Sequence, residues 1–486
     1  MSKRSASPEA QVGGESTKSA RTEQTAARDE VQKELKGGQM QAVEKKTENS
    51  ADVAETESLS GLNSSSADDA VDSTKEGQGR LAKRKVAIFF GYCGSGYSGL
   101  QINPGVKTIE GDIFDAFCRA GAVSEDNAVN PNKIQLQRAA RTDRGVHAAG
   151  NLLTAKLILQ PPALSDGQTL TEYVNTLLPS QVRIWGMRRV QNAFNARTSC
   201  DSRLYEYLLP TYVFLPPKPY SSMWKMLRRL NVGEEDPSEL IQPWEDPAVK
   251  DNEMLNHSFW QAQGYEKEFA ADMHAKRRWR ISAKELDRVR AVFDMYTGPH
   301  NFHNFTVGRD YRDRSSHRVM KKLSISDPKI INDTEWVSVK FHGQSFMLHQ
   351  IRKMVGLLVL IGRTNAPLSL ISQAFGPARI HVPKAPGLGL LLVEPHFGGY
   401  NIKVENNNER IDRMTAQRTA SGKALPPNSE DGKRQPVDYE EFQERMDVFK
   451  QTFIYDEIHR TEDSTAEFAK WLNYLDVFVG PDLYVD

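Results

Sequence analysis

Arg138-Ala-Ala-Arg141-Thr142-Asp143-Arg144-Gly145-Val146-His147-Ala148 is the stretch around which the rest of the chain can be understood. One carboxylate, Asp143, stands among three arginines and close to Gly145, a residue type that permits a tight turn and close backbone approach. Nearby cations favour the ionised form of a carboxyl group, which an acid that attacks a substrate must keep. The ordinary alternative is a solvated surface loop, because most charge clusters face water. The remaining sequence has to decide between these two interpretations.

Composition restricts the function classes without choosing one. The 486 residues carry 63 basic and 63 acidic side chains, so no overall field marks a nucleic-acid binder. Residues 1–79 are rich in Ser, Glu, Gln, Ala and Asp and nearly lack large apolar side chains. Such a segment cannot bury enough apolar surface to offset its ordering entropy, so we expect a disordered tail over residues 1–82. The acidic surplus of this tail leaves the folded remainder more basic than the total suggests.

The sequence predicts neither a secretory signal nor a membrane span. The first residues lack an apolar h-region, and the longest nearly uninterrupted apolar run, residues 354–361, is too short to cross a bilayer. The three cysteines lie far apart without a Cys-x-x-Cys pair, which suits a reducing compartment and gives no metal-site signature. Two basic clusters, Lys3-Arg4 and residues 80–85, fit nuclear import signals, although the second fits a basic start to the first strand equally well.

A glycine-rich loop follows the first expected strand. Residues 86–90 form a short, partly β-branched apolar run that predicts a buried strand. The glycines between residues 94 and 99 follow the pattern G-x-G-x-x-G, which in dinucleotide-binding folds requires a helix that begins within the glycines. The Pro104-Gly105 pair opposes a helix there, so we reject a dinucleotide site. Thr108 instead predicts the N-cap of a helix that begins later.

Strands and helices occur in two similar halves on either side of a weakly patterned central segment. Periodicity predicts further strands near residues 152–159, 182–185, 204–208, 321–326, 336–341 and 389–393. Further helices are expected near residues 170–178, 282–296, 347–361, 439–453 and 466–474. This order favours an α/β or α+β domain of two sub-lobes with a ligand-binding cleft between them.

The same patterns divide the chain beyond its tail into five segments. Residues 83–210 and 282–400 form the two sub-lobes, and the first of these carries the Asp143 loop. Residues 211–281 form a partly helical insertion. Residues 401–437 are polar and are expected to form a loop-like linker, and residues 438–486 a helical extension.

Three features outside the Asp143 loop could contribute to a site. Arg352 lies among apolar neighbours in an expected helix, so its charge is either paired or snorkels to an exposed rim. Tyr205, in an expected strand, is either half-buried packing or a ring that stacks on a base. His300 and His303 have a spacing that could bind a metal, but no cysteine or carboxylate accompanies them, so loop packing is the preferred interpretation.

The Asp143 stretch resembles the catalytic motif of the TruA family of pseudouridine synthases, and further landmarks of that family follow in the same order. These landmarks are residues 91–101, 194–197, 203–207, 298–302, 345–356 and 385–390. The resemblance covers roughly residues 84–397. The tails and the insertion are similar to the eukaryotic nuclear tRNA branch rather than to the compact bacterial enzyme. Leu204 departs from the basic residue that is common at its position.

The resemblance implies an α+β (mixed α/β) fold in which two similar sub-lobes share a central, mainly antiparallel sheet flanked by helices, with the active-site cleft between them. It implies that Asp143 is the nucleophile that breaks the N-glycosidic bond of a flipped uridine, by attack on ribose C1′ or uracil C6 or by assisting loss of the 2′ proton. Tyr205 would stack on the uracil and help remove the C5 proton. Arg352 would pair with the catalytic carboxylate, and Arg141 would fill the gap left by the flipped nucleotide.

The resemblance also implies the partners. The reaction is an isomerisation of tRNA uridines that requires no cofactor, and the implied substrates extend to tRNA precursors, small nuclear RNA and mRNA. A nuclear monomer is implied, without a membrane partner. A bound zinc is associated with the fungal branch of the family, although no clean ligand set is readable here. The basic side chains expected to grip RNA, unless they are ordinary solvated charges, are Arg138, Arg141, Arg144, Lys276, Arg277, Arg278, Arg280, Arg309, Arg312, Arg314, Lys321 and Lys322.

Two other functions remain as alternatives. A nucleoside hydrolase could use Asp143 as its nucleophile, but that chemistry usually needs a second carboxylate and the motif shows none. A catalytically silent RNA-binding or tRNA chaperone module could keep the same fold. The combination of Asp143, Tyr205 and Arg352 argues against loss of catalysis.

Overall fold

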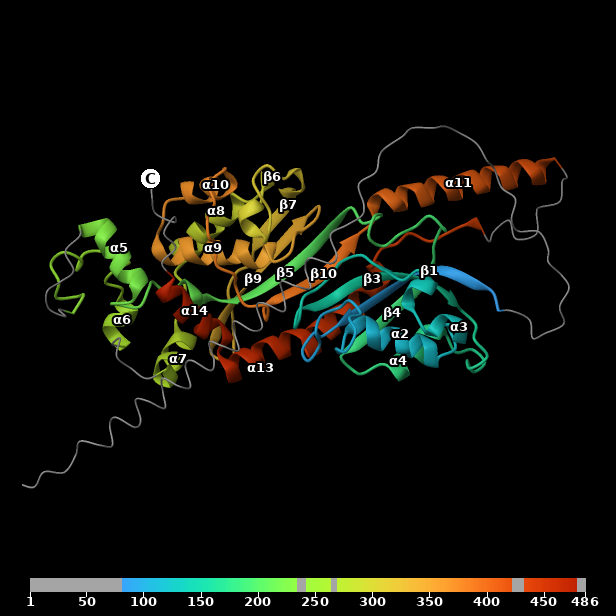
Figure 1. The fold of residues 1–486 in the computed structure, drawn as a ribbon, viewed down its shortest axis with the longest axis horizontal. Coiled ribbons are helices and arrows are strands. Elements are labelled where there is room, and N and C mark those ends of the chain that lie inside the picture. Colours follow the sequence, from blue (N-terminus) through green and yellow to red (C-terminus); the bar gives the residue numbers. More distant parts are fainter. Residues whose placement is uncertain (1–80, 234–241, 264–268, 422–431, 479–486) are drawn as a thin grey trace, which may run out of the picture. The chain divides into compact units, whose positions relative to one another are not determined.

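One ten-stranded sheet organises the part of the chain that the computed structural model describes, residues 81–233, 242–263, 269–421 and 432–478 (Figure 1). The tail expected over residues 1–82 lies almost wholly outside the described residues. The spatial strand order is β4-β1-β3-β10-β5-β9-β7-β6, with β2 paired to β3 and β8 to β9. The strands are β1 (Lys83–Tyr92), β2 (Gln137–Arg138), β3 (His147–Ile158), β4 (Val182–Arg189), β5 (Ser202–Pro210), β6 (Gly298–Asn301), β7 (His317–Ile325), β8 (Lys329–Ile331), β9 (Thr334–Gly343) and β10 (Leu390–His396).

The last strand, β10, joins the two halves of the sheet. It runs parallel to β3, with Leu391 opposite His147, and antiparallel to β5, with Leu390 opposite Tyr207. All other described strand pairs are antiparallel. The mixed α/β fold with a central, mainly antiparallel sheet is therefore confirmed.

Helices flank both halves, and their starts follow the capping residues. α2 (Ile109–Arg119) begins after Thr108, whose hydroxyl oxygen accepts the Gly111 N–H at 3.2 Å. α8 (Ala283–Asp294) begins at the predicted capping box of Ser282 and Glu285. The other helices of these halves are α3 (Glu125–Ala128), α4 (Leu170–Leu177), α9 (Gln350–Thr364) and α10 (Ser369–Phe375).

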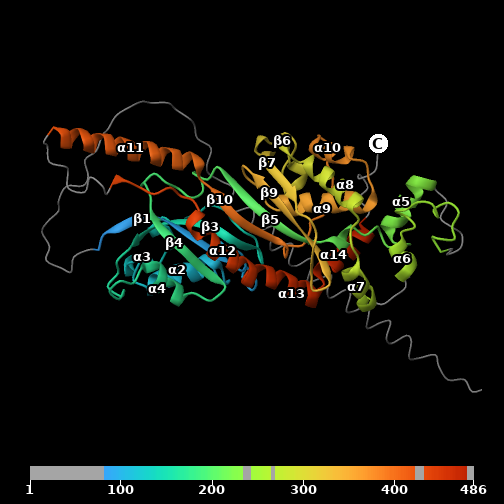
Figure 2. The same cartoon turned by 180° about the vertical axis from the view of Figure 1, so that it is seen from behind.

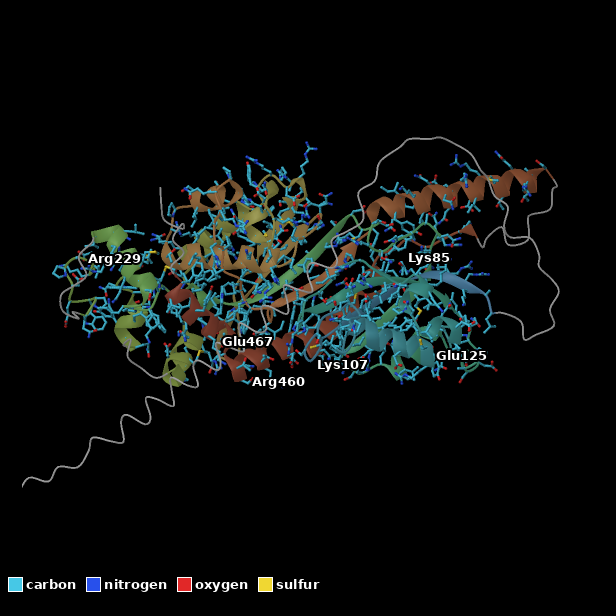
Figure 3. The ribbon with its side chains drawn as sticks, viewed as in Figure 1. Lys85, Lys107, Glu125, Arg229, Arg460 and Glu467 are labelled. Carbon is cyan, nitrogen blue, oxygen red and sulfur yellow. The ribbon has the colours of Figure 1, made fainter. Side chains whose placement is uncertain are left out.

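The basic cluster before the first strand belongs partly to the strand itself. The Lys83 ammonium donates to the Ser124 hydroxyl at 2.9 Å. The Lys85 ammonium, labelled in Figure 3, donates to the Asn192 carbonyl oxygen at 2.8 Å. These two lysines therefore tie β1 to neighbouring loops.

A long C-terminal helix crosses one face of the sheet from the first half to the second (Figure 2). It consists of α12 (Gln443–Phe449), the π-helical segment η7 (Lys450–Tyr455) and α13 (Asp456–Thr465). Just before it, the Phe442 ring packs against Phe89 of β1. Further along, the Tyr455 hydroxyl donates to Glu206 of β5 at 2.6 Å. Successive strand residues face opposite sides, so the neighbouring Tyr205 points to the other face.

The insertion is partly helical, as expected. It contains α5 (Ser222–Val232), α6 (Ser258–Gln263) and α7 (Phe269–Arg278). Two buried tryptophans hold it together: the Trp224 indole N–H donates to Leu255 O at 2.8 Å, and that of Trp260 to Pro216 O at 3.1 Å.

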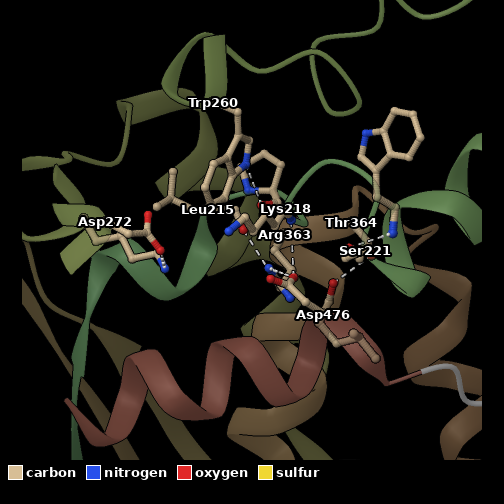
Figure 4. A network of polar contacts seen from close by, with 12 residues as sticks. Leu215, Lys218, Ser221, Trp260, Asp272, Arg363, Thr364 and Asp476 are labelled. Atoms are coloured by element: carbon tan, nitrogen blue, oxygen red, sulfur yellow. Dashed lines mark hydrogen bonds and ion pairs between the residues drawn. The ribbon is translucent and has the colours of Figure 1, made fainter. Parts of the chain in front are cut away.

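A buried ion pair connects the final helix to the core (Figure 4). Arg363 of α9 has a side chain without solvent exposure, and its Nη2 lies 2.7 Å from Oδ1 of Asp476 in α14 (Glu467–Val477). The Arg363 Nε also donates to Leu215 O at 3.1 Å. One guanidinium therefore holds together α9, α14 and the start of the insertion.

The prediction of a loop-like linker over residues 401–437 is wrong for the first half of this segment. Residues 398–420 form the 23-residue helix α11 (Gly398–Ala420), which buries only Tyr400 and Val404. The sequence pattern missed it because a helix that is polar on nearly every side has no apolar stripe. Paired amide hydrogen bonds fix its first half instead: the Asn401 side chain bonds both backbone groups of Val437, at 3.1 and 2.7 Å.

None of the helices in the described ranges is both long enough and apolar enough to cross a membrane.

Candidate active site

A cavity of about 850 Å³ lies between the two halves of the sheet. Its walls are residues 98–103, 137–144 and 146 from the first half, Arg197, Arg203 and Tyr205 from around β5, and residues 345–352 and Leu390 from the second half. Asp143, Tyr205 and Arg352, which are far apart in the sequence, therefore meet in one place.

The charges in the cavity wall are strongly unequal. Asp143 is the single carboxylate among the described residues that line the cavity, and its side chain is 37% exposed, so a substrate can reach it. The lining arginines are Arg138, Arg141, Arg144, Arg197, Arg203 and Arg352. A cleft lined by one sign of charge concentrates ligands of the opposite sign, so this cavity suits a polyanion.

The residues on either side of Asp143 are held by the sheet. The Thr142 and Tyr92 hydroxyls share a buried hydrogen bond of 2.7 Å. On the other side, the Gly94 N–H donates to Nδ1 of His147 at 3.1 Å. Burial lowers the pKa of His147 to about 4, so its ring is neutral at pH 7 and Nδ1 can accept this bond. The Asp143 loop is therefore fixed at both ends.

The glycine-rich loop allows close contact with the Asp143 loop. A Cβ atom at Gly94 would lie 2.2 Å from the Val146 carbonyl oxygen, and one at Gly99 would lie 2.9 Å from that of Thr142. Gly145 turns the Asp143 loop itself, with φ of 74°. No helix begins within the glycine pattern, as expected, because its glycines serve packing between loops.

Gly94→Ala is expected to lower the free energy of unfolding by about 1–3 kcal/mol, because the new methyl group would push Val146 and the Asp143 loop away. Urea denaturation would measure this change. Gly96→Ala is the matched control, since a Cβ there has no atom within 4 Å and only the backbone strain of φ +81° opposes it. Equal stability of the Gly94 variant and the wild type would contradict close packing of the two loops.

The arginines of the motif do not pair with Asp143. Among the described residues no arginine lies within ion-pair distance of its carboxylate. Arg138 instead forms an ion pair with Glu110, a fully buried residue of α2. Arg141 and Arg144 are exposed at the cavity wall. Their position leaves them free to contact a ligand.

Arg352 lies in the cavity wall. We expected it to pair with the Asp143 carboxylate, but its hydrogen bonds go elsewhere. Its Nε donates to Ala385 O at 2.7 Å, and its backbone oxygen accepts the Ala385 N–H at 3.0 Å. Gly356 lies one turn later on α9, and a Cβ atom there would be 1.9 Å from the Pro383 carbonyl oxygen. The loop before β10 therefore packs tightly against α9, and its Ala385 carbonyl oxygen accepts the hydrogen bond from the Arg352 Nε.

The carboxylate lies beside a histidine that the sequence analysis did not single out. Oδ2 of Asp143 is 3.2 Å from Nδ1 of His349, although the two groups are not aligned as a hydrogen bond. The helix expected from residue 347 begins at Gln350, which leaves His349 in the loop that lines the cavity. The sequence contained one signal for His349: it lies three residues, about one helical turn, before Arg352.

Tyr205 borders the cavity, with its ring edge-on to Phe346 at 5.1 Å between centroids. Burial raises the pKa of Tyr205 to about 12. The phenol is therefore protonated at neutral pH, and its ring is the group available to a ligand.

Arg203 is a second residue that was not predicted as part of the site. Its Nη2 donates to Ala139 O at 2.8 Å, and its Nη1 donates to Gln344 O at 3.2 Å. It therefore links the first-half wall to the second-half wall. Because Arg203 is two positions before Tyr205 in the same strand, strand alternation places both on the cavity side.

The basic run near the end of the insertion is largely structural. Lys276, which was expected to contact RNA, is buried and ion-paired with Asp272. Arg277 donates to Asp463 O, and Arg280 donates to Asp333 O at 3.0 Å. Arg278 is exposed. None of these four residues lines the cavity.

The described residues do not fit a zinc site. All three cysteines and all eleven histidines lie within the described ranges. No three His, Cys, Asp or Glu side chains there are grouped so that they could hold a metal ion.

Comparisons with known proteins identify relatives of this chain. A family model described as tRNA pseudouridine synthase matches residues 292–398. The tRNA pseudouridine synthase 1 of Yarrowia lipolytica is 40% identical over 431 residues, which cover 82% of this chain and 76% of the relative. That of Schizosaccharomyces pombe is 36% identical and covers 82% of this chain and 84% of the relative. The tRNA pseudouridine(27/28) synthase of Saccharomyces cerevisiae is 38% identical over 66% of this chain and 86% of its own length.

Proposed function

Because the chain belongs to the TruA family of pseudouridine synthases, in its eukaryotic branch, we propose that its cavity isomerises uridine to pseudouridine in tRNA with Asp143 as the nucleophile. The observation that carries the assignment of Asp143 is its position in an arginine-lined cavity between the two sub-lobes, where it is the single carboxylate that the described part of the chain contributes. It is also partly exposed, so it can reach a substrate.

The reaction breaks the bond between N1 of uracil and C1′ of ribose and forms a bond between C5 and C1′. Asp143 attacks C1′ or C6, or assists loss of the 2′ proton, and the detached uracil rotates before it rejoins the sugar. The proton on C5 then leaves and N1 gains one, so the product is an isomer of the substrate. No redox change or nucleotide energy is required.

The uridine must leave its base stack before Asp143 can reach it, at a cost of a few kcal/mol. Arg141 and Arg144 are exposed at the cavity wall, and a guanidinium plane can replace a lost stacking partner or hold a phosphate. We assign Arg141 to the gap left by the flipped nucleotide. Arg352 and Arg203 shape the wall and add positive charge near the sugar-phosphate backbone.

The test is release of tritium from tRNA labelled at C5 of uridine, with nucleoside analysis of the product. Tritium release together with pseudouridine supports the proposal. Free uracil would indicate the hydrolase, and tRNA binding without release or product would indicate the silent RNA-binding module.

Tyr205→Leu is expected to lower kcat/KM by about 5- to 150-fold, because base–aromatic stacking contributes about 1–3 kcal/mol. Tyr205→Phe keeps the ring and should stay within about tenfold of the wild type, since the buried phenol is protonated and is not a base at pH 7. Initial tritium-release rates measure both variants. A Phe variant as inactive as the Leu variant would show that the hydroxyl takes part in the chemistry.

We extend the proposal to a monomer that acts in the nucleus on tRNA precursors, small nuclear RNA and mRNA. The resemblance to the eukaryotic branch supports each of these points. The import signal is Lys3-Arg4, because Lys83 and Lys85 of the second basic cluster are used to tie β1. Microscopy of a tagged chain and sequencing of pseudouridine in total RNA would test location and substrates.

A further inference from the structure

His349 occupies an unusual backbone conformation beside the catalytic carboxylate. Its φ of 63° lies in the left-handed region, and it directly precedes α9. Histidine tolerates this region better than most residues, but the conformation is still strained. The turn is fixed on both sides, because the Met347 N–H donates to Oε1 of the buried Gln350 at 2.9 Å and the Lys353 N–H donates to His349 O at 3.0 Å. The structure therefore maintains a strained residue at this place.

Three charged groups face the imidazole, each from a different segment. Asp143 approaches from the first half, Arg352 from α9 and Lys384 from the loop before β10. Burial and the Lys384 charge lower the pKa of His349, against the opposite effect of Asp143, so the ring is neutral at pH 7. Its Nδ1 is buried and has no hydrogen-bond partner among the described residues, while Asp143 Oδ2 lies 3.2 Å away.

We propose that His349 is a positioning residue for Asp143, whose carboxylate it orients by donating its Nδ1–H to Oδ2 when a uridine is bound. This inference rests on the proposed role of Asp143 as nucleophile. A small rotation of either side chain would turn the present 3.2 Å approach into an aligned hydrogen bond. The other carboxylate oxygen, Oδ1, then faces the sugar.

A neutral imidazole suits this role better than a charged one. A neutral donor fixes the carboxylate and leaves most of its negative charge for attack, whereas an imidazolium would form a full ion pair with it. Arg352 lies in the same wall, but its Nε is bound to Ala385 O, and the ion-pair partner within reach of Asp143 is His349 rather than Arg352. The Lys384 charge helps keep the ring neutral.

Three variants separate the imidazole from the backbone strain. His349→Gly removes the ring and relieves the backbone strain, whereas His349→Ala removes the ring but keeps the backbone strain. His349→Asn keeps an N–H donor near the position of Nδ1 and also tolerates positive φ. The experiment measures single-turnover tritium release, tRNA Kd and Tm for each full-length variant.

We expect His349→Gly and His349→Ala to lose about 10- to 100-fold in rate, because misplacement of a reacting group by about 1 Å has an effect of this size. His349→Asn should recover most of the rate, and tRNA Kd should not change in any of the three. Full activity of the Gly and Ala variants would overturn the inference. A Kd that rises as much as the rate falls would also overturn it, since His349 would then be an RNA contact.

The pH profile gives a readout that a merely structural residue would not change. The wild-type rate should fall on the acid side below pH 6.5, the ordinary pKa of histidine, as the imidazolium forms. In His349→Asn this acid limb should move to lower pH, and an unchanged limb would contradict the role. A wrong assignment of Asp143 can be told apart from a wrong assignment of His349. If Asp143→Asn were active, Asp143 would not be the nucleophile, whatever the His349 variants show.

Discussion

Asp143→Asn is expected to abolish tritium release from C5-labelled tRNA, with a loss of about 10⁴-fold or more in the single-turnover rate. Asparagine has nearly the same shape, but its amide is not a nucleophile. The loop should keep its place, because its anchors are Thr142 and His147 rather than Asp143. The carboxylate is 37% exposed, so its removal leaves no buried partner charge and Tm should stay close to that of the wild type. Filter binding should show an unchanged Kd for tRNA.

Asp115→Asn is the matched control for this change. Asp115 lies on α2 with a side chain that is 64% exposed, and it pairs with Arg119 at the surface. Exposed pairs of this kind contribute a few tenths of a kcal/mol, so activity, Kd and Tm should all be retained. A residual rate of Asp143→Asn within tenfold of the wild type would contradict its role as nucleophile. Parallel loss of tRNA binding would reassign it to RNA recognition.

Arg363→Met is expected to lower the free energy of unfolding by about 3–5 kcal/mol, because it leaves Asp476 buried without its partner. It also removes the donor to Leu215 O, which helps hold the insertion. Thermal melting followed by circular dichroism measures the effect. At temperatures where the variant is folded, tritium release should be normal, since neither residue lines the cavity.

The double variant Arg363→Met with Asp476→Leu distinguishes an unpaired charge from lost packing. Replacement of a buried ion pair by apolar side chains of similar volume is often neutral, so the double variant should recover most of the lost stability. A double variant as unstable as the single one would show that the pair matters through its geometry between α9 and α14. Both outcomes can be read from the same melting curves.

The sequence predicted those parts of the fold where one physical signal dominates. Buried strands such as residues 86–90 and capped helices such as those after Thr108 and Ser282 were found because apolar runs and N-caps are local. Helix α11 was missed because hydrogen bonds from Asn401 and Asn408 to distant backbone hold it instead of an apolar stripe.

The site was predictable to a similar extent. The resemblance located the residues that meet in the cavity, but it could not show which atoms are already engaged. Arg352 binds the loop before β10, and the position next to Asp143 belongs to His349 because α9 begins three residues later than the apolar pattern suggested. A basic run likewise does not reveal that one member, Lys276, is buried with Asp272.

The position of β10 in the middle of the sheet also determines when the enzyme can become active during synthesis. Until β10 emerges, β5 lacks its β10 neighbour, and β3 lacks it at His147 and Ala148. β10 begins at Leu390, whereas β5 ends at Pro210. At about 5–20 residues per second, the ribosome needs on the order of 10–40 s to make the intervening segment. Exposed strand edges of this kind invite pairing with other chains. The nascent protein therefore carries an unpaired β5 edge in this interval, and catalysis cannot begin before residues 345–352 and Leu390 complete the cavity.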